Sequence, residues 1–142
     1  MQKEIIIVIV IVIIIISADV LTQKYTANSF TDINNQLDEI RRIGKELEEI
    51  EKLENNSLES QEKKKVLEEK IDNMQDDWRK INKRTAFYIE HDELEKVNAS
   101  MTKFRSYFEL EEYTEAIPEL EDCKYILNHI KEKESMQFIN LF

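Results

Sequence analysis

Glycine, proline and cysteine are almost absent from this chain of 142 residues, which has one of each, Gly44, Pro118 and Cys123. Tight hairpin turns and phosphate-binding loops depend on glycine and other turn-forming residues. Their scarcity argues against a sheet protein or a nucleotide-binding loop, and it predicts an all-α protein. A single cysteine also excludes an intrachain disulfide, so a disulfide-stapled secreted domain is ruled out.

Positive charge is in short supply as well. The chain has 20 basic and 30 acidic residues, and removing Lys3, Glu4 and Asp19 leaves 19 and 28 after Leu21, a net charge of −9. Nucleic acids and anionic lipid headgroups bind positive surface. We therefore expect neither nucleic acid nor anionic lipid as a direct partner of this acidic part of the chain. The one basic run, residues 63–65, stands among glutamates and is typical of a solvated helix face with i,i+4 ion pairs.

A long apolar run is what the chain does have. Residues Ile5 to Ile16 are all isoleucine or valine, and Val20 and Leu21 extend the run past Asp19. As a helix, Ile5 to Leu21 is about 25 Å long, slightly less than a hydrocarbon core of about 30 Å. The sequence predicts a membrane anchor over residues 1–22, with the lipid bilayer as its partner.

Two other interpretations of the run stay open. It has the length of a signal-peptide core, although only Ile16-Ser17-Ala18 approximates a cleavage site, and no cysteine follows that would make it a lipoprotein. It is also compatible with a buried core segment. With Lys3 and the amino terminus retained inside, we expect a single-pass protein of the cell membrane whose C-terminal domain is extracytoplasmic.

Apolar residues recur at steps of three and four along the rest of the chain, which is the pattern of amphipathic helices. Long helices with short connections favour antiparallel hairpins. The expected fold is therefore a transmembrane helix followed, in residues 23–142, by an antiparallel bundle of about four helices in two hairpins. The expected helices cover residues 28–55, 57–90, 92–109 and 114–133, with a packed C-terminal tail at 134–142.

Several single residues carry expectations about packing. Trp78, Phe104 and Leu127 are expected in the core, because each lies on an apolar stripe. Gly44 lies beside the first stripe, where another segment can approach closely. Pro118 fits a helix that starts near residue 114, because the first turn has no amide bond to lose.

One group of residues has the chemistry of a metal site. His91, Asp92 and His129 supply two imidazoles and a carboxylate, which suit zinc or iron if the last two helices bring them together. The structural alternative is that both histidines satisfy helix ends and that Asp92 caps the third helix. No Glu-x-x-His motif of di-iron bundles is present. Because no nucleophile is paired with a base, we expect a protein that is not an enzyme and has no cofactor.

The second half of the chain resembles a family of uncharacterised proteins. The resemblance is carried by Trp78, Tyr88–Leu94, Leu127–Ile130 and the ending Ile139–Phe142. The family consists of small bacterial proteins, mainly from spore-forming Gram-positive bacteria, with one N-terminal membrane helix and a domain of unknown function. The resemblance implies an anchored helical extracytoplasmic domain and supplies no activity, cofactor or catalytic residue.

Three functions are weighed on these grounds. The first is an anchored interaction or scaffold protein, in an envelope or sporulation context, with a protein partner and with homo-oligomers allowed through the stripe of Ile33 to Leu53. The alternative is a ligand- or metal-sensing domain that uses the His91/His129 region. An enzyme such as a cell-wall hydrolase ranks last, because no acid–base pair stands apart from the helix faces.

Overall fold

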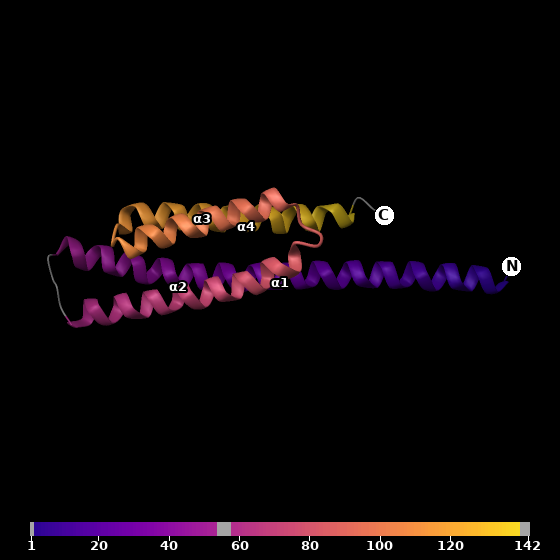
Figure 1. Cartoon of the computed structure of the whole chain (residues 1–142), viewed down its shortest axis with the longest axis horizontal. Helices are drawn as coiled ribbons and strands as arrows, with labels where there is room; N and C mark the ends of the chain where they lie inside the picture. The colour runs from indigo at the N-terminus through magenta and orange to yellow at the C-terminus, as the bar shows by residue number, and fades with distance from the viewer. Residues whose placement is uncertain (1, 54–57, 140–142) are drawn as a thin grey trace.

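Four helices and no strands make up the described part of the chain (Figure 1). The computed structural model describes residues 2–53 and 58–139, with side chains described up to Ser135. The helices are α1 (Gln2–Lys52), α2 (Leu58–Thr85), α3 (His91–Glu109) and α4 (Tyr113–Ile139). The expected all-α class is confirmed. The junction expected between the first two helices falls on residues 54–57, outside the described ranges.

The apolar run and the first amphipathic stripe form one continuous helix of 51 residues. No glycine or proline interrupts the polar link between them, and its threonines reinforce the helix. The Thr22 hydroxyl donates to the Ala18 carbonyl at 2.9 Å, and the Thr26 hydroxyl donates to the Thr22 carbonyl at 3.0 Å. The apolar run therefore continues directly into the amphipathic stripe, and no separate linker divides them.

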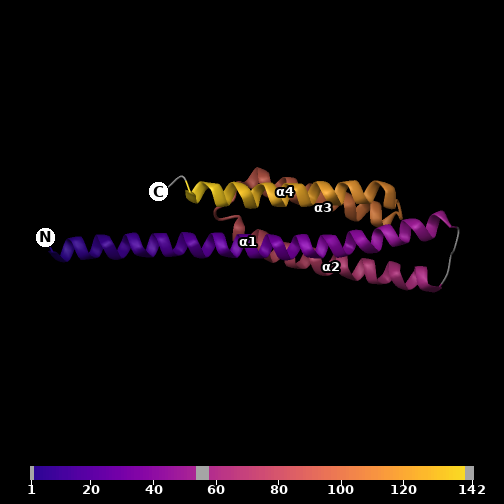
Figure 2. The same ribbon diagram turned by 180° about the vertical axis from the view of Figure 1, so that it is seen from behind.

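The helices lie side by side over the carboxyl-terminal part of α1. Here α1 packs against α2 and α4, and α3 packs mainly against α4, whereas α2 and α3 make few contacts with each other. Both views show that the amino-terminal part of α1 extends alone beyond the other helices (Figures 1 and 2). We call the packed part, from Thr26 to Ser135, the helical body.

The core follows the apolar stripes. Trp78, Phe104 and Leu127, which were expected in it, are buried. The stripe proposed for self-association is also buried from Ile33 to Leu47, so in the described chain that face is occupied by the protein's own helices. The buried residues include Phe30, Ile33, Leu37, Ile40, Ile43 and Leu47 of α1, Leu67, Ile71, Met74, Trp78 and Ile81 of α2, Leu94, Val97, Met101, Phe104 and Phe108 of α3, and Leu120, Cys123, Leu127 and Ile130 of α4.

The second helix ends five residues earlier than expected. The amides of Tyr88 and Ile89 both donate to the Thr85 carbonyl, which closes a turn there. Ile89 is consequently buried, and the chain reverses before α3. The expected cap at Asp92 is wrong: the residue before α3 is Glu90, no side chain caps that end, and Asp92 lies inside the first turn.

Two expectations about α4 also need correction. Because α4 begins at Tyr113, Pro118 lies beyond the first turn, where it deprives the Thr114 carbonyl of its amide partner. The short connection before α4 is made by Glu111, whose φ of 61° lets the Glu112 amide donate to the Tyr107 carbonyl at 2.9 Å. At the other end, α4 continues to Ile139, so no separate tail begins at residue 134. The expected packing of the tail concerns side chains outside the described part.

Candidate interaction groove

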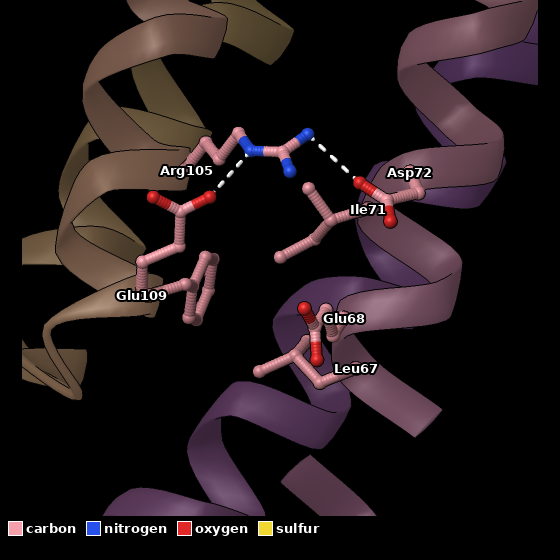
Figure 3. Close-up of a pocket in the computed structure, with 7 residues that line it drawn as sticks. Leu67, Glu68, Ile71, Asp72, Arg105 and Glu109 are labelled. Atoms are coloured by element: carbon pink, nitrogen blue, oxygen red, sulfur yellow. Dashed lines mark hydrogen bonds and ion pairs between the residues drawn. The ribbon is translucent and has the colours of Figure 1, made fainter. Parts of the chain in front are cut away.

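The seam between α2 and α3 contains two hollows. One hollow in it has a cavity volume of about 170 Å³ (Figure 3), and a second, of about 270 Å³, lies further along the same two helices. We call these two hollows together the α2/α3 groove. The first is lined by Leu67, Glu68, Ile71, Asp72, Arg105, Phe108 and Glu109, and the second by Gln75, Trp78, Arg79, Asn82, Asn98, Met101 and Thr102.

Arg105 bridges the groove from α3. Its Nη1 lies 2.8 Å from Asp72 Oδ1 and also donates to Gln75, while its Nε lies 2.6 Å from Glu109 Oε1 (Figure 3). The Glu109 and Asp72 carboxylates raise the pKa of Arg105 above its ordinary value, against the opposing effect of burial. The Arg105 guanidinium therefore stays protonated, and its N–H groups are held by acceptors on both α2 and α3.

A second polar bridge lies two turns away. The Trp78 indole Nε1 donates to Asn98 Oδ1 at 2.8 Å, and Asn82 Nδ2 donates to the same oxygen at 3.4 Å. Seven residues separate Asn98 from Arg105 on α3 and Gln75 from Asn82 on α2, a helical rise of about 10 Å. Polar contacts therefore join α2 and α3 at two levels, with apolar side chains beneath them.

The sequence alone does not reveal this groove. Asn98 and Arg105 stand beside the apolar stripe of α3, where polar residues usually face solvent. Their spacing of seven residues, matched by Gln75 and Asn82 on α2, is the only signal that could have pointed to a pair of bridges. It becomes meaningful only when the facing helix is known.

The residues predicted for a metal site are not assembled into one. His91, at the start of α3, is exposed with its Nε2 3.7 Å from Glu95 Oε1, and the exposed His129 ring stacks on Tyr125 with centroids 6.4 Å apart. In the described ranges, no group of three or more His, Cys, Asp or Glu side chains is arranged to hold a metal. His129 also lies ten residues before the end of α4, so the idea that it satisfies a helix terminus is wrong.

Trp78 and Cys123 are both packed in the core of the protein. The Trp78 ring packs on Phe30 with centroids 5.7 Å apart, and Cys123 is fully buried. Burial, and to a lesser extent the Asp122 carboxylate, raises the pKa of the Cys123 thiol to about 12. The nucleophilic thiolate is therefore almost absent at neutral pH.

Cys123 should accordingly resist thiol reagents in the folded protein. We expect no reaction with Ellman's reagent at pH 8 under native conditions and one thiol per chain after unfolding in guanidinium chloride, because both access and ionisation require unfolding. Absorbance of the released thiolate measures this. Native labelling as fast as that of a free thiol would contradict the buried position.

The last turns of α4 lie beside the base of the apolar run. Burial raises the pKa of Glu134, and the Glu93, Glu90 and Asp19 carboxylates raise it further, while Lys133 opposes them. Lys133 forms ion pairs with Glu93 at 2.9 Å and Glu90 at 3.2 Å. This end of the helical body thus concentrates negative charge that is only partly neutralised.

Replacing Glu134 by glutamine should stabilise the protein at neutral pH. A carboxyl whose pKa is raised by folding contributes stability that is complete below its unfolded pKa, near 4.5, and is lost as pH rises through the folded value. We therefore expect Glu134→Gln to raise Tm at pH 7 and to change it little below about pH 4.5. Thermal unfolding in detergent micelles at both pH values tests this; an equal shift at both would contradict it.

The residues expected to form a membrane anchor are exposed in the structure. Ile5 is 58 %, Ile16 37 % and Leu21 68 % exposed, although the whole run is apolar. Among the described residues, α1 is the one helix long and apolar enough to cross a membrane. Tyr25, beyond the run, lies under the Arg84 guanidinium, whose central carbon is 5.4 Å from the ring centroid.

Comparison with known proteins agrees with the resemblance to an uncharacterised family. No curated protein and no solved structure shows a significant match to this chain. One family does match: the domain of unknown function DUF4363 covers residues 20–141, a range that begins after the isoleucine and valine run and includes the whole helical body. Because the match spans most of the sequence, the chain belongs to the DUF4363 family.

Proposed function

We propose that the protein is a single-pass membrane protein that holds an extracytoplasmic, antiparallel helical bundle at the membrane surface, where it binds a protein partner. The observation that carries the proposal is the continuity of α1. One helix is wholly apolar and exposed over Ile5–Ile16 and then supplies the core of the body from Phe30 onward. An exposed apolar surface of this extent needs a bilayer or another apolar partner.

The proposed orientation rests on charge. Lys3 is the only basic residue before the apolar run, and positive residues are retained on the cytoplasmic side. The strongly acidic body suits a surface that contacts proteins and is repelled by anionic headgroups.

Two measurements test the anchor and its orientation. External protease should degrade the helical body in intact protoplasts, and the protein should have an intact mass of 17.0 kDa, with no residues removed. A body that is protected until lysis would overturn the orientation. A mass lacking the first 18 residues would favour the signal-peptide interpretation.

The proposed contact surface is the α2/α3 groove. It has an apolar floor of Leu67, Ile71 and Phe108, and the Arg105 guanidinium is already engaged by Asp72 and Glu109. The groove extends over about 22 Å along α2, enough for a partner helix of about four turns. The Glu68 carboxylate on the rim adds negative charge, so the proposed occupant is an amphipathic helix with lysine or arginine beside its apolar stripe.

Adjacent glutamates on α2 provide a matched test. Glu68 lines the groove and Glu69 does not, yet both are exposed. A photo-crosslinking amino acid at position 68 in intact cells should capture a protein that is missed from position 69. The crosslink should weaken when Glu109→Lys is added, since that change reverses an exposed charge that lines the groove. Equal capture from both positions would remove the groove from the proposal.

A further inference from the structure

The loop between α2 and α3 presents an exposed aromatic residue at the end of the body that faces the apolar run. Phe87 is 89 % exposed, while its neighbour Ile89 is buried and holds the loop against the body. A single exposed apolar side chain needs no explanation by itself. The exposure of Phe87 becomes informative because of its position relative to the proposed bilayer.

Two contacts fasten this loop to α1 just beyond the apolar run. The Tyr88 and Thr26 hydroxyls are hydrogen-bonded at 2.8 Å, and Arg84, in the last turn of α2, lies over the Tyr25 ring. Figures 1 and 2 both show the loop beside α1 where that helix leaves the body. The height of the loop along α1 is therefore fixed by residues 25 and 26.

That height corresponds to the headgroup layer of a bilayer. Thr26 follows Leu21, the last residue of the apolar run, by five residues, which is about 7.5 Å along a helix. The polar layer on each side of the hydrocarbon core is about 5–7 Å thick. When the run spans the membrane, the loop lies at the outer edge of the headgroup layer, a level from which an exposed aromatic side chain can enter the interface.

The charges next to the loop suit this position. Lys83 and Arg84 are both exposed in the last turn of α2, so their long side chains can approach lipid phosphates. The carboxylates on the α3 side, Glu90 and Glu93, share the single cation Lys133, so the basic residues lie on the α2 side of the loop and the excess negative charge lies on the α3 side. An aromatic residue flanked by basic residues is typical of segments that bind the membrane interface.

We infer that Phe87 inserts into the outer interface of the membrane and that the α2–α3 loop is a second lipid contact of this protein. The inference rests on the proposed membrane anchoring. Two points of attachment, α1 and the loop, fix the body end-on, with the α3–α4 connection directed away from the bilayer. The α2/α3 groove is then presented along the side of the body, above the lipid.

Site-specific fluorescence on the full-length protein tests the contact. In a Cys123→Ala background, Phe87→Cys is labelled with the polarity-sensitive dye NBD and reconstituted in vesicles of phosphatidylcholine and phosphatidylglycerol. We expect a blue-shifted emission and strong quenching by lipids that are spin-labelled near the headgroup. Ala86→Cys, also exposed in the loop, should behave similarly and guards against a local effect of the label.

Two further positions make the outcome decisive. Leu110→Cys, at the exposed α3–α4 connection, should give the emission of NBD in water and no quenching. Val12→Cys, in the apolar run, should be quenched by lipids that carry the spin label within their acyl chains. Quenching at position 12 but not at 86 or 87 would overturn the loop contact and leave the anchor intact. Quenching at 110 equal to that at 87 would overturn the end-on orientation. Loss of quenching at position 12 would instead reject the proposed anchor.

Discussion

Replacing Gly44 by valine is expected to lower the free energy of unfolding by about 3 kcal/mol, although glycine is an unfavourable residue in a helix. A Cβ atom at position 44 would lie 2.7 Å from Cε1 and 3.1 Å from Cζ of Phe108. The ring is itself packed between Phe104 and Tyr113, with centroid distances of 6.2 and 6.1 Å, so moving it away from α1 disturbs both of these contacts. The packing penalty therefore exceeds the helix-propensity gain, which is at most about 1 kcal/mol.

Urea unfolding followed by the fluorescence of Trp78, the only tryptophan, measures the Gly44→Val effect. Asn35→Val, at an exposed position of the same helix, should change stability by no more than about 0.5 kcal/mol. Adding Phe108→Leu shortens the obstructing side chain, so the double variant should be more stable than the sum of the single effects predicts. Unchanged stability of Gly44→Val would show that the Phe108 ring does not lie against α1.

The second large effect is expected in the apolar run, where Val10→Lys with Ile13→Lys should release the protein from the membrane. Twelve isoleucine and valine residues contribute about −4 to −7 kcal/mol to insertion, and two lysines near the bilayer centre cost about 5–7 kcal/mol. The balance that favours insertion is thereby cancelled. The measure is the fraction of protein retained in the membrane pellet after alkaline carbonate washing.

A charge-matched control separates this effect from a change in net charge. Asn35→Lys with Asn73→Lys adds the same two charges to exposed positions of the helical body and should leave the protein in the pellet. The released variant should retain helical circular dichroism, because the body does not depend on residues 10 and 13. Retention of the Val10→Lys/Ile13→Lys variant at the level of the control would argue against a spanning helix.

The sequence by itself determined the helical class, the apolar run and the buried faces. Scarce glycine and proline removed turn-based folds, and steps of three and four identified buried residues such as Phe104 and Leu127, because a helix repeats its faces at short range. The ends of the helices were harder to predict from the sequence. The stripe of α2 continues in phase to Tyr88, yet the helix stops at Thr85, where the turn that buries Ile89 replaces helical bonding.

Only the tertiary structure decided which side chains meet. His91 and His129 have suitable chemistry for a metal, but they are exposed and engage Glu95 and Tyr125. Arg105 and Asn98 look like ordinary surface residues until α2 lies opposite them. The physical reason is that helix periodicity is a local property, whereas the partners of a side chain depend on the rotation and offset of another helix, which packing of the whole core sets.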